Sequence, residues 1–211
     1  MLIFLTGGAR SGKSSLAERI ARKREEELGS PVCYLATARP GDTEMVERIS
    51  RHQERRPADW LTIEEPLKPA AAVKNAGLQS GSTIILDCVT LLVSNRLLAQ
   101  DTTADVDKEE NEIENGVELD ALQKNIQEEL AELLKLAEKK NHLLLAVSNE
   151  VGLGVVPPSP LGRKFRDLSG WINQWLAARA DQSYLVVAGI VLDLKDLEVN
   201  KISLPPGKTM K

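Results

Sequence analysis

The segment Gly7-Gly-Ala-Arg-Ser-Gly-Lys-Ser14 decides the fold class of this chain. Its glycines, lysine and serine follow the spacing G-x-x-x-x-G-K-[ST], which is typical of a phosphate-binding loop. The segment follows the apolar run Leu2–Thr6, a predicted buried strand, and precedes Ser15–Leu28, a predicted helix. A Gly-rich turn explains neither the Lys-Ser pair nor this context, so we predict a P-loop.

In a P-loop, backbone N–H groups and the positive end of the following helix attract phosphate oxygens. Lys13 is therefore a candidate catalytic residue acting on the β and γ phosphates, and Ser14 is a candidate Mg²⁺ ligand. The whole segment is predicted to bind nucleotide through Gly7, Gly8, Ala9, Arg10, Ser11, Gly12, Lys13 and Ser14.

Further short apolar runs are predicted to be buried strands, because Gly, Pro or polar residues bound them. These runs are Val32–Ala36, Thr83–Cys88, Leu143–Ser148 and Tyr184–Ile190. Apolar residues at helical spacing from Leu119 to Ala137, and the stretch Leu161–Ala180, predict helices between them. Near-continuous apolar strands separated by helices indicate an α/β fold, with a mostly parallel sheet and helices on both faces. We expect a P-loop NTPase fold of the RecA-like kind.

Length and composition limit the classes of function. A chain of 211 residues predicts one domain, residues 1–211. A net charge of −4, with no basic block, argues against nucleic acid as a partner. No apolar run is long enough for a membrane span, and the motif begins within seven residues of Met1, so we expect a cytoplasmic protein. Cys33 and Cys88 lie in apolar runs and are predicted to be buried thiols.

Some segments are predicted to carry no chemistry. The acidic stretch Asp101–Gly116 is interpreted as an exposed excursion between two helices, and residues 200–211 as a fraying tail. Trp171 and Trp175, one helical turn apart, are predicted to pack in the core. His142 is interpreted as structural.

Asp87 is the candidate for a second metal-binding group. It ends the apolar run Thr83-Ile-Ile-Leu-Asp87, and P-loop enzymes hold the metal and its water shell with an acidic residue at the end of a buried strand. That position also places it at the carboxyl edge of the sheet, where ligands bind in open α/β folds. The alternative is an ordinary Asp that caps the next helix.

The basic stretch Arg48-Ile-Ser-Arg-His-Gln-Glu-Arg-Arg-Pro-Ala-Asp-Trp60 is the next informative segment, and it contains His52. Together with four other segments, it resembles the bifunctional adenosylcobinamide kinase/adenosylcobinamide-phosphate guanylyltransferase family. These segments are TGGARSGKS at 6–14, YLATA at 34–38, SNEVGLGVVP at 148–157 and RKFRDLSGWINQWLAARAD at 163–181. The resemblance spans most of residues 1–195.

The resemblance implies two activities in cobalamin assembly. The first is phosphorylation of adenosylcobinamide with ATP or GTP, and the second is transfer of GMP from GTP to adenosylcobinamide phosphate. In the second, a histidine carries GMP as a phosphoramidate, which suits a nucleophile that is neutral near pH 7. His52 is the candidate, since family members can have a second adjacent histidine where this chain has Arg51. Without the resemblance, His52 would be interpreted as a solvated surface histidine.

Further residues are candidates for binding the guanine nucleotide and the acceptor. By resemblance, Ala36, Thr37, Ala38 and Glu64 line the guanine-nucleotide site. Gln53 and Arg56 are further candidate nucleotide-binding residues. Glu64 is predicted to accept from the N1–H and amino group of guanine. The arginines beside His52 either neutralise phosphates or form a solvated face. Asn149 and Glu150 follow a buried strand and are candidates for the acceptor site, although the glycines behind them also fit a simple turn.

Two other functions stay open at this point. One is a P-loop kinase acting on another small molecule, with no covalent intermediate. The other is a RecA-like ATPase module whose nucleotide cycle drives binding to a partner, against which the charge and length argue. The P-loop implies Mg²⁺ as cofactor. The resemblance implies a homo-oligomer, with a trimer as the expected form.

Overall fold

The computed structural model describes residues 1–41, 43, 47, 50, 53–54, 56–101 and 112–197. Within these ranges the strands form one seven-stranded sheet in the order β3-β2-β4-β5-β1-β6-β7. The strands are β1 Leu2–Thr6, β2 Val32–Ala36, β3 Leu61–Glu64, β4 Thr83–Asp87, β5 Leu143–Val147, β6 Gln182–Val187 and β7 Ile190–Asp193. Only the β6–β7 pairing is antiparallel.

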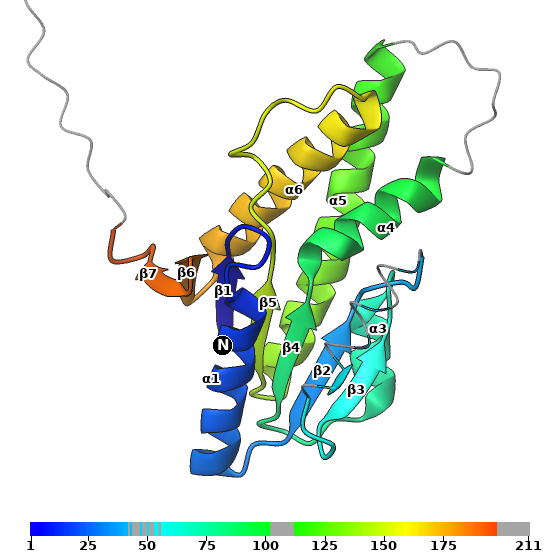
Figure 1. Cartoon of the computed structure of the whole chain (residues 1–211). Helices are drawn as coiled ribbons and strands as arrows, with labels where there is room; N and C mark the ends of the chain where they lie inside the picture. The colour runs from blue at the N-terminus through cyan, green and yellow to red at the C-terminus, as the bar shows by residue number, and fades with distance from the viewer. Residues whose placement is uncertain are drawn as a thin grey trace, which may run out of the picture.

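The helices cover both faces of this sheet (Figure 1). They are α1 Lys13–Leu28, α3 Pro69–Ala76, α4 Val89–Asp101, α5 Glu112–Lys139 and α6 Pro160–Arg179. Ala17 and Ala21 of α1 pack with the side chains that β1, β2, β4 and β5 present on one face. Side chains of α3, α4, α5 and α6 pack with those on the other face. The predicted α/β class, with a mostly parallel sheet and helices on both faces, is confirmed.

The central strands form because they are apolar along their whole length. All five residues of β1, β2 and β5 are buried. A strand covered by helices on both faces must be apolar at successive positions, not at alternating ones. This explains why the short apolar runs located these strands to within one residue.

The predicted single strand Tyr184–Ile190 is wrong. Residues 182–193 form a hairpin, with β6 pairing antiparallel to β7 and Val187 opposite Ile190. The two turn residues, Ala188 and Gly189, have φ values of +51° and +80°. Paired positive φ values suit a two-residue hairpin turn, but Ala-Gly is not one of the usual sequence signals for it.

Other predictions need smaller corrections. α5 begins at Glu112, so the predicted excursion Asp101–Gly116 overlaps helices at both ends, while residues 102–111 lie outside the described part. Trp171 is exposed, contrary to the core role predicted for it, whereas Trp175 packs against the core and under the Arg179 guanidinium. The predicted tail at 200–211 also lies outside the described residues.

Buried His142 and the two cysteines are as predicted. The structure leaves Cys33 and Cys88 as free, buried thiols. His142 is 3% exposed, just before β5. In the described part of the chain, no helix is both long and apolar enough to cross a membrane.

Candidate active site

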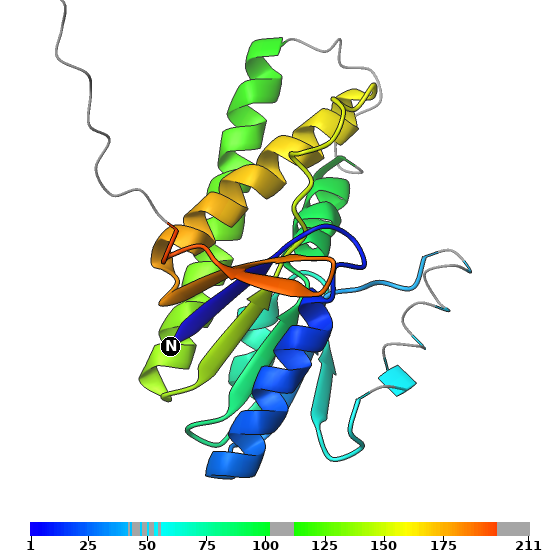
Figure 2. The ribbon, with the colours of Figure 1, turned by 60° about the vertical axis from the view of Figure 1, so that its left-hand side comes forward.

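The Gly-rich loop leaves β1 at Thr6 and closes against the C-terminal hairpin (Figure 2). A Cβ atom on Gly7 would lie 2.3 Å from the carbonyl oxygen of Val186 in β6, so only glycine fits there. At the other end of the loop, Gly189 donates its N–H to the Ser11 carbonyl over 2.9 Å. The hairpin therefore holds the loop at two points.

Lys13 and Ser14 begin α1, directly after Gly12, whose φ of +101° suits glycine. The Lys13 Nζ donates to the Gly8 carbonyl over 2.9 Å, and the side chain is only 7% exposed. The first turn of α1 contains no acidic residue, so its positive end is left for a bound anion. The loop thus has the geometry of a phosphate-binding site.

Residues predicted from three separate strands lie in one row across the sheet. Ala36 in β2 pairs with Glu64 in β3 on one side and with Asp87 in β4 on the other. Through Val147 in β5, the same row reaches Leu5 in β1, two residues before Gly7. Because these strands are parallel, Glu64, Asp87 and the loop share the carboxyl edge of the sheet. β5 separates β4 from β1, so Asp87 is not on a strand next to the loop.

The Asp87 carboxylate is held by a side chain of the neighbouring strand. Its Oδ2 accepts a hydrogen bond from the Tyr34 hydroxyl. Among the described residues, no group of three acidic, cysteine or histidine side chains is placed to hold a metal. A single carboxylate and a hydroxyl suit Mg²⁺, which keeps several waters and arrives with nucleotide phosphates. Asp87 and Ser14 fit that role.

Tyr34 links Asp87 to Arg56. The Arg56 guanidinium carbon lies 3.7 Å from the centroid of the Tyr34 ring. Burial, and then the nearby Asp87 carboxylate, raise the pKa of Tyr34 far above its ordinary value, so the phenol stays protonated and donates. Arg56 Nε and Nη1 are buried, and within the described residues they have no acceptor.

Thr37 is occupied by the protein itself. Its hydroxyl donates to the Cys88 carbonyl over 2.7 Å and accepts from the Cys88 N–H over 2.9 Å. Asn95 of α4 donates to the Thr37 carbonyl over 2.8 Å. Thr37, which is predicted to line the nucleotide site, therefore also holds the ends of β2 and β4 together. Ala36 is buried and Ala38 half-buried, so they offer backbone and small side chains there.

Glu64 is exposed at the end of β3 and accepts from the Gln53 Nε2 over 2.8 Å. The two predicted nucleotide-binding side chains are thus in contact, although Gln53 comes from the segment before β3. The predicted nucleophile His52 lies outside the described residues, as do Arg51 and Arg55.

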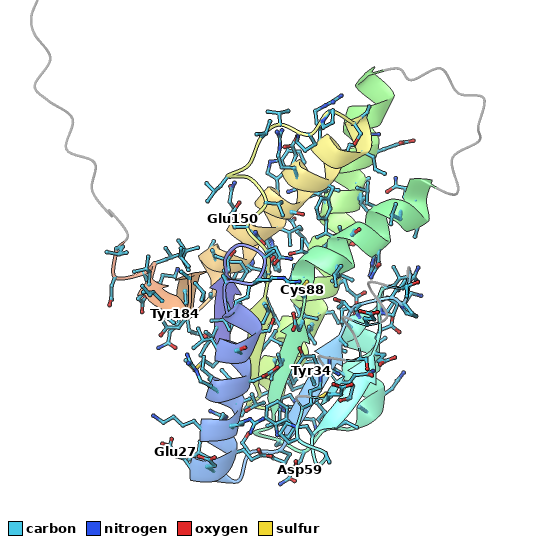
Figure 3. All side chains as sticks on the ribbon, viewed as in Figure 1. Glu27, Tyr34, Asp59, Cys88, Glu150 and Tyr184 are labelled. Carbon is cyan, nitrogen blue, oxygen red and sulfur yellow. The ribbon has the colours of Figure 1, made fainter. Side chains whose placement is uncertain are left out.

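Asn149 and Glu150 follow β5 and lie against the P-loop. The Glu150 N–H donates to the Gly7 carbonyl over 3.0 Å, and its Oε1 accepts from the Gly152 N–H. Figure 3 shows Glu150 on the loop above β5 and Cys88 at the end of β4. The Asn149 carbonyl accepts from Asn173 of α6 over 3.0 Å. Its N–H donates to the Thr90 hydroxyl, so the backbone of this loop is fixed from beneath.

The two cysteines are unsuited to nucleophilic chemistry. Burial raises the pKa of both Cys33 and Cys88 to about 12. A thiol with that pKa is protonated at neutral pH and is a poor nucleophile or metal ligand.

Sequence reasoning missed Tyr34, Asn95 and Asn173. Tyr34 carried a usable signal, because its hydroxyl is the one polar side-chain group in the apolar run Val32–Ala36. A buried phenol needs a hydrogen-bond partner, which implies a polar neighbour at that level of the sheet. Asn95 and Asn173 lie within helices, where sequence spacing does not indicate which strand end an amide would reach.

Three curated relatives are similar to the chain along almost its whole length. The bifunctional adenosylcobalamin biosynthesis protein CobP of Pseudomonas aeruginosa is 40% identical over 192 residues, 91% of this chain and 96% of that protein. The bifunctional adenosylcobalamin biosynthesis proteins CobU of Escherichia coli and Salmonella typhimurium are each 37% identical, covering 92% of this chain and all of theirs.

Two solved structures are similar to part of the chain and distant in sequence. A KaiC-like protein of Pyrococcus horikoshii has a TM-score of 0.44 and 13% identity, covering 87% of this chain and 69% of its own. The ATPase domain of G40P has a TM-score of 0.48 and 11% identity, covering 87% and 68%. The family described as cobinamide kinase/cobinamide phosphate guanyltransferase matches residues 3–194, and the chain belongs to it.

Proposed function

We propose that this protein phosphorylates adenosylcobinamide and then transfers GMP from GTP to the resulting phosphate, giving adenosylcobinamide-GDP. Membership of the cobinamide kinase/cobinamide phosphate guanyltransferase family supports both activities. The observation that carries the proposal most directly is the meeting of the P-loop, Asp87 and Glu64 at one sheet edge. One nucleotide could there have its phosphates on the loop and its base near Glu64.

In the kinase step, the hydroxyl oxygen of adenosylcobinamide attacks the γ-phosphorus of ATP or GTP. The bond from that phosphorus to the bridging oxygen breaks, the nucleoside diphosphate leaves, and the hydroxyl proton passes to water. Lys13 and the N–H groups of Gly7–Ser14 balance the charge on the phosphate oxygens. Mg²⁺, held by Ser14 and Asp87, would neutralise charge on the phosphates when bound.

In the transferase step, an imidazole nitrogen of His52 attacks the α-phosphorus of GTP, and pyrophosphate leaves. The phosphate of adenosylcobinamide phosphate then attacks the same phosphorus, the N–P bond breaks, and free histidine returns. Arg56 supports this proposal, because its two buried donors without a described acceptor suit a phosphate oxygen. Gln53, which contacts Glu64, directly follows His52 in the chain.

The acceptor is proposed to approach over Asn149 and Glu150. Their loop is fixed to Gly7 on one side and to Thr90 and Asn173 on the other. A fixed loop next to the P-loop is suited to orient a hydroxyl or phosphate for attack. A homo-oligomer, expected as a trimer, is part of the same proposal and is tested by light scattering of the purified protein.

Covalent labelling tests the central step. Purified protein is incubated with Mg²⁺ and GTP labelled at the α-phosphate, denatured, and assayed for bound label. We expect label that is stable in alkali and lost in acid in wild type and in His142→Gln, and no label in His52→Ala. Absence of label in wild type that binds GTP would favour a small-molecule kinase without a covalent intermediate.

A second assay addresses the kinase step. Transfer from ATP labelled at the γ-phosphate to adenosylcobinamide is measured for wild type, His52→Ala and Lys13→Ala. We expect His52→Ala to retain this transfer, because its imidazole serves only guanylyl transfer, and Lys13→Ala to lose it. ATP hydrolysis without transfer to adenosylcobinamide would favour an ATPase module instead.

A further inference from the structure

Tyr34 occupies a central position between two groups of the proposed site. It is 1% exposed in the middle of β2, on the face that α1 covers. Figure 3 labels it within the sheet, below the level of Cys88. Its hydroxyl reaches the Asp87 carboxylate at the end of β4, and its ring lies under the Arg56 guanidinium.

We infer that Tyr34 is a positioning residue, which orients the Asp87 carboxylate toward the metal–nucleotide complex and supports the Arg56 guanidinium beside the same phosphates. The inference rests on the proposed function for the identity of that ligand. Tyr34 itself touches neither metal nor nucleotide in this scheme. It acts through two side chains that come from different parts of the chain.

The Tyr34 hydroxyl determines how the Asp87 carboxylate is oriented. A carboxylate at a strand end can rotate, and rotation spreads its two oxygens over several directions. The bond from the Tyr34 hydroxyl fixes Oδ2, and this gives Oδ1 a defined direction. A metal site gains affinity when a hydrogen bond outside the ligand shell orients a ligand in this way.

The second part concerns Arg56. Its guanidinium plane lies over the phenol ring, and this contact leaves the N–H groups at its edge to bind oxygen atoms. Nε and Nη1 find no acceptor in the part of the chain that the structure describes. A forked pair of donors of this kind matches two oxygens of a phosphate.

The segment that carries Arg56 is also fixed on its other side. Trp60 is buried, and its indole N–H donates to Glu25 of α1 over 2.9 Å. The Arg56 N–H donates to the Gln53 carbonyl over 3.1 Å. The Arg56 guanidinium is thus held between Tyr34 and a short turn that packs on α1. The Tyr34 ring therefore determines how far the guanidinium extends toward the Gly-rich loop.

Packing alone does not account for a tyrosine at this position. Phenylalanine would fill the same space, and burying a hydroxyl is unfavourable unless it is hydrogen-bonded. The hydroxyl here is bonded to a carboxylate at the rim of the sheet rather than to the backbone. The variant Tyr34→Phe therefore separates the two parts, because it removes the donor to Asp87 and keeps the ring under Arg56.

The test measures binding of a fluorescent GTP analogue to the full chain, with Mg²⁺ and with EDTA. The Mg²⁺ dependence is the dissociation constant in EDTA divided by the dissociation constant with Mg²⁺. For Tyr34→Phe we expect this ratio to fall about tenfold, mainly because binding with Mg²⁺ becomes weaker. Binding in EDTA should be unchanged, since Arg56 keeps its support. Tyr184→Phe, at the other of the two tyrosines in the chain, is the matched control and should bind like wild type in both conditions.

Two further variants make the assignment specific. Tyr34→Leu removes ring and hydroxyl together, so binding should weaken in EDTA as well as with Mg²⁺. Asp87→Asn should lower the Mg²⁺ dependence, and adding Tyr34→Phe to it should lower it no further, because the two side chains act as one unit. Thermal unfolding without ligand shows that each variant is folded.

A Tyr34→Phe protein that is folded and has the Mg²⁺ dependence of wild type would overturn the inference, as would tighter binding with Mg²⁺. These outcomes are independent of covalent labelling. If wild type fails to form the histidine adduct yet shows this Tyr34 effect, the inference stands and the transferase proposal falls. If labelling succeeds and the Tyr34 effect is absent, the transferase proposal stands and the positioning role of Tyr34 falls.

Discussion

Arg96 of α4 and Glu129 of α5 form an ion pair of 2.9 Å in which the two side chains are only 15% and 14% exposed. Arg96 also donates to the Leu67 carbonyl before α3, and the second oxygen of Glu129 accepts from the Ala70 N–H in the first turn of α3. This pair therefore joins three helices that cover one face of the sheet.

Replacing Arg96 with Ala should destabilise the protein by about 3 kcal/mol, because it leaves a mostly buried carboxylate without its partner. The free energy of unfolding is measured by urea denaturation. Lys23→Ala, which breaks the exposed Lys23–Glu27 pair on α1, is the control and should change stability by less than about 0.5 kcal/mol. Equal effects of the two substitutions would contradict this account.

Gly7→Ala should lower stability by more than about 2 kcal/mol even without nucleotide, since the new Cβ overlaps the Val186 carbonyl. Gly8→Ala places its Cβ in open space and should leave the unfolding temperature close to that of wild type. Thermal unfolding followed by circular dichroism distinguishes them. Nearly equal unfolding temperatures would show that the loop yields at Val186.

His142 should make stability fall below about pH 6.5. Burial, followed by the nearby Lys140 charge, lowers the pKa of the imidazole in the folded protein. In the unfolded chain the pKa returns to about 6.5. Below that pH the unfolded state binds a proton that the folded state does not, so the free energy of unfolding decreases; above it both forms are neutral.

His142→Gln should remove this part of the pH dependence. Urea denaturation at pH 7.5, 6.5 and 5.5 measures the free energy of unfolding of the variant and of wild type. The titration of carboxylates cancels in the difference between the two proteins. His52→Gln tests the only other histidine in the chain. If the free energy of unfolding of His142→Gln changes with pH as it does in wild type, then the His142 imidazole of wild type is protonated as easily in the folded as in the unfolded state.

Glu64→Gln should weaken binding of GTP about tenfold and leave ATP binding unchanged, because the substitution removes a charged acceptor that only guanine can use. Isothermal titration with each nucleotide measures this selectivity. Glu54→Gln, at an exposed glutamate close by, is the control. If both nucleotides weaken equally, Glu64 supports the segment through Gln53 and does not contact the base.

The parts of the fold that could be predicted are those with local signals. Gly7–Ser14 and the apolar strands β1, β2, β4 and β5 depend on residue types that have few other structural solutions. β3 was missed because a strand of four largely exposed residues has no apolar run. The turn at Ala188 and Gly189 was missed because its backbone geometry follows from pairing of β6 with β7, and not from a local turn preference.

The site could be predicted where a motif or the end of a strand marks it, as for Lys13 and Asp87. The contacts that join these residues could not be predicted, because they depend on register across strands. Tyr34 meets Asp87 only because β2 and β4 are adjacent and aligned so that Ala36 faces Asp87. Nothing in the spacing of residues 34 and 87 along the chain indicates that alignment.

The contacts between the hairpin and the Gly-rich loop have a consequence for biosynthesis. The loop is made first, since it lies within fourteen residues of Met1, but Val186 and Gly189 fix its shape. β1 likewise has β6 as one of its two neighbours in the sheet. A nascent chain on the ribosome therefore carries the complete motif before the strands that pack against it have been made.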